Sequence, residues 1–297
     1  MKRSSSVKFP NSVQLFKFCL KVMAYKKGSK VRDQEVGAIL NFNPSDCSHW
    51  KRGEKNVKSV FVLAKLSETL GVESSLIHDV ASGAINLDEA FFEYIESNSI
   101  KQICDDSKNI ETDELRQNVV TFVDAIHAES QFTTPPLYLP EVFRLFSFIS
   151  TQPVDMIDRL SRVLRVKAGR YGIQYKKGDL KPQTRMSIVK DFARVIFEVE
   201  RSRYPELGTA SKESIAYEEL LFVANLLIPR NLLMSELTRL DARKNVVAEL
   251  AALFWVPKSL ICFQLQEMVK YSQLEMRMTA NEVPSASANT HVEMSNI

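Results

Sequence analysis

The chain has 297 residues, of which 45% are hydrophobic and 25% charged, with a formal net charge of +3, a composition ordinary for a globular protein with room for two domains. No apolar run approaches the roughly 18 to 20 residues of a membrane helix, and no apolar segment follows the charged N-terminus, so we expect neither a membrane protein nor a secretory signal. The four cysteines form no CxxC pair, which argues against a disulfide framework and predicts reduced thiols in the cytoplasm.

The charge is unevenly distributed along the chain. Residues 1–83 contain 14 Lys and Arg against 7 Asp and Glu, a net charge of +7, whereas the remainder contains 25 against 29, a net charge of −4. A basic first third followed by a slightly acidic remainder indicates a module that binds a polyanion, joined to a second unit of different function.

Helical spacing of apolar residues predicts an N-terminal all-α domain of five helices over residues 12–83. Glycines mark several of the expected helix ends, as glycine commonly does. The expected helices are a first one capped by Ser12 and ended by Gly28, a second over 36–40 ending at Asn41, a third over Ser45–Lys51 ended by Gly53, a fourth over Phe61–Leu70 closed by Gly71, and a fifth beginning at Ser75–Val80.

A helical connector is expected over residues 84–135, with helices at Leu87–Glu96 and Asp113–Ala128 around a polar segment, Cys104–Thr112. The prolines of Thr133–Pro140 cannot continue a helix and mark a domain boundary. The connector and the C-terminal domain are the two candidates for dimer contacts.

An α+β domain with a small sheet is expected over residues 136–275, followed by a disordered tail over 276–297. The overall fold class is therefore mainly α. A short helix is expected over Pro140–Phe146 and an apolar-alternating piece over Phe148–Met156. Strands are expected over Leu160–Val166 and Arg170–Tyr175, although a helix over Val154–Leu164 fits the pattern equally well. The remaining expected helices are Lys181–Tyr204, Ser211–Leu227, Asn231–Leu240, Asp241–Phe254 and Lys258–Glu275.

The segment Asp33–Asn56 reads DQEVGAILNFNPSDCSHWKRGEKN, with apolar residues at Val36, Ile39 and Leu40, an Asn in the turn, and an Arg-Gly pair at its end. It resembles the helix-turn-helix of XRE-type (Cro/C1-like) repressors without a gap. The following Lys58–Val72, ending in LSETLGV, resembles the fourth helix of that family. Two acids depart from the family pattern: Asp33, where Gln is common, and Asp46, where Ser or Thr is common.

The resemblance implies that the third helix lies in the major groove of double-stranded operator DNA, with short polar side chains at base edges and cations on phosphates. Cys47 and Trp50 are expected on its inner face. Asn43 has the donor and acceptor geometry for adenine and His49 for guanine, whereas Lys51, Arg52 and Lys55 are expected phosphate contacts. The full set of candidate DNA-binding residues is Asn43, Ser45, Asp46, Ser48, His49, Lys51, Arg52 and Lys55.

The segment Gly172–Val199 resembles the core of ImmA/IrrE-type metallopeptidases, which carry R-F-T-x-A-H-E-x-G-H on a helix. Here Arg185–Arg194 reads RMSIVKDFAR, so that Lys190 and Arg194 stand at the two histidine positions and Asp191 at the glutamate position. Further on, AYEELLFVANLLIP (Ala216–Pro229) resembles the segment that supplies the third ligand, with Glu218 at one of its acidic positions.

Two cations in place of imidazoles would repel a divalent metal ion, and no HExxH occurs. We therefore expect no metal, no cofactor and no enzymatic activity. Lys190, Asp191, Arg194 and Glu218 either form internal ion pairs, bind an anionic small molecule or peptide effector, or contact a protein partner. An enzyme of unfamiliar chemistry using the first three is a further alternative.

These patterns together predict a transcriptional regulator that binds operator DNA as a homodimer and whose degenerate peptidase-like domain senses a ligand or mediates assembly. The alternative is a partner-binding protein, such as an antitoxin or a scaffold, whose C-terminal domain recognises another protein.

Overall fold

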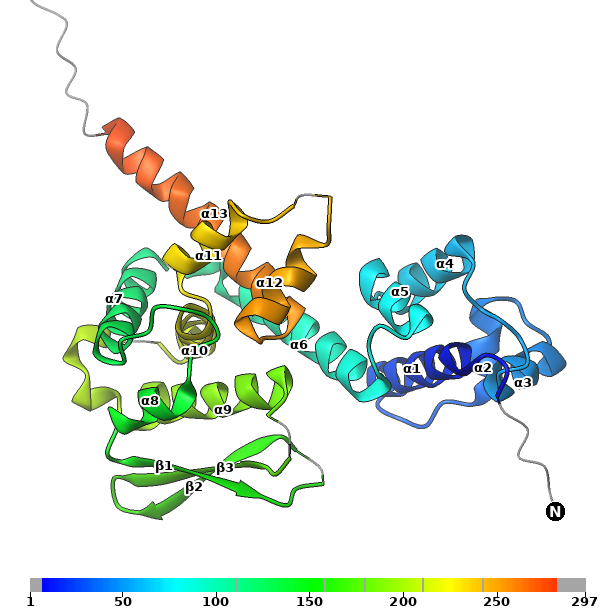
Figure 1. Ribbon diagram of the computed structural model, residues 1–297, viewed down its shortest axis with the longest axis horizontal. Helices are drawn as coiled ribbons and strands as arrows, with labels where there is room; N and C mark the ends of the chain where they lie inside the picture. The colour runs from blue at the N-terminus through cyan, green and yellow to red at the C-terminus, as the bar shows by residue number, and fades with distance from the viewer. Residues whose placement is uncertain are drawn as a thin grey trace, which may run out of the picture.

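The computed structural model describes residues 7–110, 112–157, 159–178, 180–209, 211–241 and 243–281. These residues form thirteen α-helices and one small mixed sheet of three strands, which confirms the expectation of a mainly α fold (Figure 1). The helices and the sheet surround two separate hydrophobic cores.

The first core lies in the N-terminal unit, which contains five helices. They are α1 (Pro10–Lys27), α2 (Asp33–Ile39), α3 (Pro44–Arg52), α4 (Val60–Leu70) and α5 (Ser74–Ser82). Glycines at the ends of α1, α3, α4 and α5 adopt the left-handed conformation, and the sequence predicted three of these ends, at Gly28, Gly53 and Gly71.

Ser12 does not cap the first helix, contrary to expectation. The helix α1 begins at Pro10, whose ring sets the backbone angle that a first helical turn needs, and Phe9 is the cap residue. Ser12 lies one turn inside, where its Oγ accepts the Val57 N–H at 3.0 Å. The hydroxyl therefore stabilises the loop before α4 instead of the helix end.

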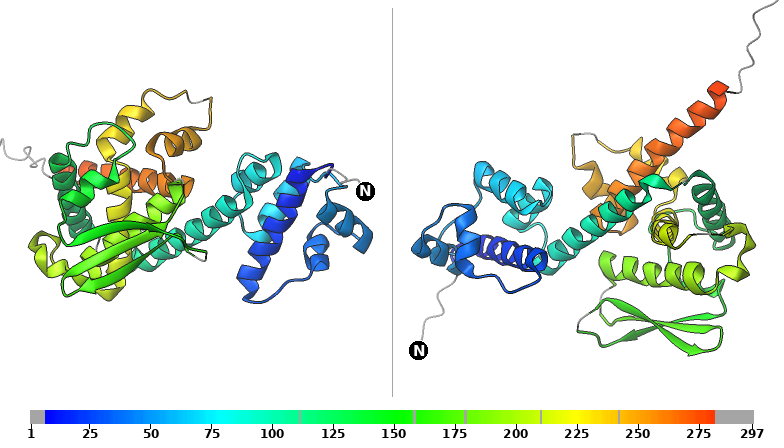
Figure 2. Two further views of the ribbon diagram at one scale, coloured as in Figure 1. Left: turned by 60° about the horizontal axis from the view of Figure 1, so that its bottom comes forward. Right: turned by 180° about the vertical axis from the view of Figure 1, so that it is seen from behind.

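The helix α6 (Leu87–Asp106) joins the two units (Figures 1 and 2). Its first half contributes Ala90 and Tyr94 to the N-terminal core, and its second half contributes Ile100 to the C-terminal core. The sequence predicted a helix that ended near Glu96, but it continues through the polar Ser97–Ser99 because Ile100 and Ile103 pack against the C-terminal unit.

The sheet has the strand order β1–β3–β2, with β1 (Ile149–Val154) parallel and β2 (Ser161–Lys167) antiparallel to β3 (Arg170–Lys176). Alternate residues of the central strand, Tyr171 and Ile173, are buried, as a strand covered on one face requires. The helical alternative for Val154–Leu164 was wrong, because β1 ends and β2 begins within that range.

The C-terminal unit packs helices on one face of the sheet, and α9 lies between the sheet and α10 (Figure 1). Its helices are α7 (Asp113–Glu129), α8 (Leu139–Arg144), α9 (Pro182–Arg194), α10 (Lys212–Leu227), α11 (Arg230–Leu237), α12 (Val246–Phe254) and α13 (Lys258–Asn281). The helix α7, expected in the connector, contributes Val119 and Phe122 to this core.

Several helix boundaries differ from the predictions. The helix expected over Lys181–Tyr204 ends at Arg194 and continues as a π-helical turn, Val195–Val199, and a 3₁₀ turn, Arg201–Arg203. The helix expected to start at Asp241 starts at Val246, where Asn245 caps it by accepting the Ala248 N–H. The last helix runs through Asn281, so residues 276–281 of the expected disordered tail are helical, and 282–297 lie outside the described residues.

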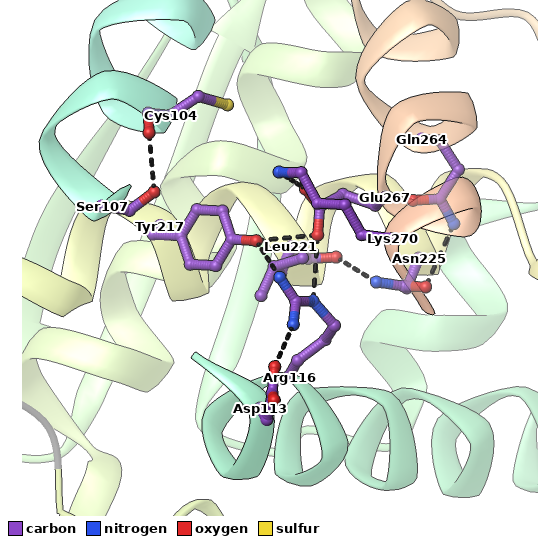
Figure 3. Close-up of polar contacts among 10 residues, drawn as sticks. All are labelled: Cys104, Ser107, Asp113, Arg116, Tyr217, Leu221, Asn225, Gln264, Glu267 and Lys270. Atoms are coloured by element: carbon purple, nitrogen blue, oxygen red, sulfur yellow. Dashed lines mark hydrogen bonds and ion pairs between the residues drawn. The ribbon is translucent and has the colours of Figure 1, made fainter. Parts of the chain in front are cut away.

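A buried polar network ties α7, α10 and α13 together (Figure 3). The Arg116 guanidinium donates to Glu267 at 3.0 Å, to the Tyr217 hydroxyl at 2.8 Å and to Asp113 at 2.8 Å. The Tyr217 hydroxyl donates to Oε2 of Glu267 at 2.7 Å, and the Lys270 ammonium donates to Oε1 of Glu267 at 2.6 Å. Glu267 is fully buried and Arg116 is 4% exposed, so each charge depends on its partners.

Among the described residues, no single helix has the length and apolarity to cross a membrane. Two bent helix pairs, Lys212–Leu227 with Arg230–Leu237 and Val246–Phe254 with Lys258–Lys270, pass that test together by length and composition alone.

Candidate functional site

The helices α2 and α3 form a compact unit joined by the four residues Leu40–Asn43. Asn41 adopts a left-handed conformation, with φ of 57°, which reverses the chain direction. Gly37 lets the two helices approach closely, because a Cβ atom there would lie 2.8 Å from the Cβ of Cys47. The sequence correctly predicted a helix, a tight turn and a second helix at these positions.

Two side chains of α3 face inward, as predicted. Cys47 is 3% exposed and Trp50 is fully buried. The Trp50 indole packs edge-on against Phe16 at 5.1 Å and Phe42 at 5.9 Å, and its Nε1 donates to the Ser12 carbonyl at 2.8 Å. This contact fixes α3 against α1 and leaves the opposite side of α3 free of the core.

The eight residues predicted to contact DNA lie on or next to α3, and none of them is buried. Ser45 is exposed at the start of the helix. Asn43 is the cap residue, and its Oδ1 accepts the Asp46 N–H at 2.8 Å. An anion near this end of α3 would also meet the positive end of the helix dipole.

Each predicted phosphate-binding cation is paired with a carboxylate in the free protein. Lys55 lies 2.8 Å from Asp46, and Lys51 pairs with Asp33. Arg52 donates to Glu54 at 2.9 and 3.1 Å.

Glu54 is a site residue that the sequence analysis missed. It accepts from Arg52 and from His49, and these contacts hold the pKa of its carboxyl below the ordinary range. The sequence contained a signal for this pairing, because Glu54 is only two residues from Arg52 and directly follows Gly53. The charges of the three cations and the three acids of this surface therefore cancel in the free protein.

The aromatic ring of Phe42, which also packs against Trp50, orients the Lys55 side chain. Its ammonium lies 4.0 Å from the centroid of the Phe42 ring, a cation–π distance. The Arg52 guanidinium also donates to the Ser48 Oγ at 3.0 Å. The cations therefore have defined positions at both ends of α3.

The residues expected to form a degenerate peptidase site pair with acidic and basic partners from different elements. Lys190 pairs with Glu96 of α6. Glu218, which is 2% exposed, accepts two hydrogen bonds from Arg201, at 2.6 and 2.7 Å. Arg194 lies 3.4 Å from Asp191, one of the internal pairs that the sequence left open.

Asp191 is buried beside the sheet. The Ser161 hydroxyl of β2 donates to its Oδ2 at 2.5 Å, and the Ser187 hydroxyl lies 2.6 Å from that of Ser161. Burial raises the pKa of the Asp191 carboxyl, and Ser161 and Arg194 partly oppose this shift. These contacts join α9 to the sheet, which is a structural role.

Glu219, not Glu218, faces the charges of α9. Burial and then the neighbouring Glu198 raise the pKa of Glu219 to about 7, while Arg194 and Lys190 act in the opposite direction. Its Oε1 is buried without a hydrogen-bond partner. Adjacent residues of a helix differ by about 100° in direction, so the motif match at Glu218 did not predict this face.

Within the described residues, no group of three or more His, Cys, Asp or Glu side chains has an arrangement that would hold a metal ion. Comparison of the chain with protein-family models, curated proteins and solved structures finds no match.

Proposed function

We propose that this chain is a transcriptional regulator that binds operator DNA sequence-specifically as a homodimer. The observation that supports this most is the orientation of α3. Its apolar residues, Cys47 and Trp50, anchor it to the core, and its polar and cationic residues gather on the opposite side. A helix that enters the major groove needs this division.

In the proposed complex, α3 lies in the major groove with its N-terminal end toward the bases. His49 contacts a guanine and Asn43 an adenine by their donor and acceptor geometry. Lys51, Arg52 and Lys55 leave their intramolecular carboxylates for phosphates. Exposed ion pairs contribute little to stability, so this exchange has a small cost.

We propose a homodimer because a single module of this size buries too little surface against DNA for specific binding, whereas two modules bury twice as much. The start of α4 offers one contact surface, because Val60 is 67% and Phe61 is 88% exposed. We propose that this apolar pair contributes to the dimer contact.

The C-terminal unit is proposed to have no peptidase activity and to regulate the DNA-binding unit. Lys190 and Arg194 stand where a zinc site would need neutral imidazoles, and both have acidic partners. In this proposal Lys190 holds α9 against α6, and Arg194 pairs with Asp191 of its own helix.

Fluorescence anisotropy with labelled DNA from the region upstream of the protein's own coding sequence tests the proposal. His49→Ala should weaken binding to this DNA by about tenfold relative to wild type, since one base contact contributes about 1–3 kcal/mol. Binding to a scrambled sequence should hardly change. Lys212→Ala, an exposed lysine at the start of α10, is the matched control and should bind as wild type. Equal affinity of the wild type for both sequences would contradict sequence-specific binding.

A further inference from the structure

A cavity of about 340 Å³ lies between the two units of the molecule. Leu76 of α5 lines it from the N-terminal unit, and Val247 and Ala251 of α12 line it from the C-terminal unit. Its size falls in the range of small-molecule sites, and its wall combines an apolar surface with a few polar groups. An occupant would contact both units at once.

Trp255 forms part of the wall in a strained conformation. It ends α12 with φ of 55°, a left-handed geometry that a bulky residue rarely adopts and that glycine adopts without steric cost. The indole remains 39% exposed, and the Arg185 guanidinium lies 6.0 Å from its ring centroid. Such strain clusters at ligand-binding positions, where the side chain itself is required.

The charged groups of the wall are mainly acidic. The Lys258 ammonium of the C-terminal unit lies 2.6 Å from Oδ2 of Asp79 in the N-terminal unit, so these two charges neutralise each other. Glu73 and Glu93 also line the cavity, and no ion pair joins either of them to a cation in the described part of the chain. The wall therefore has an excess of two carboxylates.

Glu93 is the more buried of these two acids, at 7% exposed. One of its oxygens accepts the Ser259 N–H at the start of α13. Burial raises the pKa of its carboxyl, and the hydrogen bonds with Ser259 and the charge of the nearby Lys258 oppose this shift only in part. Lys258 forms its ion pair with Asp79, so a positively charged group in the cavity would give Glu93 a direct ion-pair partner. Gln183 adds an amide oxygen that is buried without a hydrogen bond, a further acceptor in the same wall.

We propose that this cavity binds a small organic cation, an amine attached to a flat apolar body. The ammonium would pair with the carboxylates of Glu73 and Glu93, and the apolar body would lie against Trp255 and Ala251. This site differs in place and in charge preference from the anion site expected at Lys190 and Arg194.

The position of the cavity indicates what binding would change. The wall joins α5 of the DNA-binding unit to α12 and α13 of the other unit, beside the pair of Asp79 and Lys258. A ligand that fits one relative placement of the two units better than another shifts the population toward it. This regulatory step rests on the proposed DNA-binding function, whereas the cation site itself does not.

Isothermal titration of the full chain without DNA tests the site, with three probes of matched shape and different charge. Phenethylamine is the cation, phenethyl alcohol the neutral analogue and hydrocinnamate the anion. We expect saturable binding of one phenethylamine per chain, binding of the alcohol about tenfold weaker, and no binding of hydrocinnamate, because the wall is acidic.

Two variants locate the binding. Glu93→Gln keeps a carbonyl oxygen for the Ser259 N–H and should weaken phenethylamine binding by about tenfold. Ala252→Phe places a ring at an exposed position of the cavity wall and should abolish binding. Ala216→Phe, at an exposed position of α10 outside the cavity, is the matched control and should bind as wild type.

The site is overturned if phenethylamine does not saturate the protein at up to about 10 mM, the weak range expected of a ligand with few atoms. It is also overturned if hydrocinnamate binds equally well, or if Ala252→Phe leaves the affinity unchanged. The titration contains no DNA, so its failure leaves the DNA-binding proposal standing. Conversely, an absence of DNA binding in protein that binds phenethylamine overturns only the proposed regulator.

Discussion

The buried network around Glu267 permits a prediction of stability from the structure. Replacing Glu267 by Gln keeps the side-chain volume but removes the charge that faces Arg116 and accepts from Tyr217 and Lys270 (Figure 3). Breaking one side of a buried ion pair costs about 3–5 kcal/mol. Asp113, a second and mostly exposed acid on the guanidinium, remains in place. We therefore expect the lower end, a loss of about 3 kcal/mol in the free energy of unfolding.

Urea unfolding at pH 7 measures this loss, and the double variant Arg116→Met/Glu267→Leu is the control for its cause. Replacement of both partners by apolar residues leaves no unpaired charge, so the double variant should be more stable than Glu267→Gln despite two changes. A loss below about 1 kcal/mol for Glu267→Gln, or a double variant that is less stable than it, would refute the reasoning.

The network also predicts a pH dependence. Burial alone would raise the pKa of Glu267, but the hydrogen bonds from Lys270 and Tyr217 outweigh it and hold the pKa below the ordinary value of 4.5. The contribution of Glu267 is therefore complete above pH 4.5 and is lost as the pH falls through the lower folded-state pKa. The difference between wild type and Glu267→Gln should shrink in the same acid range.

Three further predictions concern the candidate sites. Glu54→Gln releases Arg52 from its carboxylate, so DNA binding measured by anisotropy should tighten severalfold and its salt dependence should steepen by about one unit of log–log slope; weaker binding would contradict this. Asp191→Ala leaves the Ser161 hydroxyl without its acceptor and should lower the free energy of unfolding in urea by about 1–3 kcal/mol while DNA affinity stays at the wild-type value; a loss of DNA affinity would place Asp191 in the functional site. Burial raises the pKa of Glu219 to about 7, so its stabilising contribution is complete below pH 4.5 and is lost as the pH rises through 7; Glu219→Gln should therefore gain about 1–2 kcal/mol over wild type between pH 5 and pH 8 in urea unfolding, and a constant difference would contradict the shift.

Local signals in the sequence predicted most of the N-terminal unit. Gly28, Gly53 and Gly71 end helices because they adopt the left-handed conformation, and that preference belongs to the residue itself. The inward positions of Cys47 and Trp50 followed from helical spacing. The prediction at Ser12 failed because Pro10, through its fixed backbone angle, starts the helix two residues before Ser12.

Charge partners across the fold could not be predicted in the same way. Lys190 and Glu96 are 94 residues apart in the sequence, and their contact depends on how α6 crosses α9. The choice between Glu218 and Glu219 depends on a rotation of α10 that its nearly continuous apolar sequence leaves open. The neutralisation of Arg52 by Glu54 is different, since both residues lie at one helix end and a local reading of charge would have found it.

A hydroxyl-radical footprint on the upstream DNA tests the central proposal most directly. The account predicts protection of two half-sites whose centres lie about one helical turn, roughly 34 Å, or a multiple of it apart, as a dimer of this helix-turn-helix unit requires. Uniform protection of the whole fragment, or none at protein concentrations that saturate nonspecific DNA, would contradict a sequence-specific regulator.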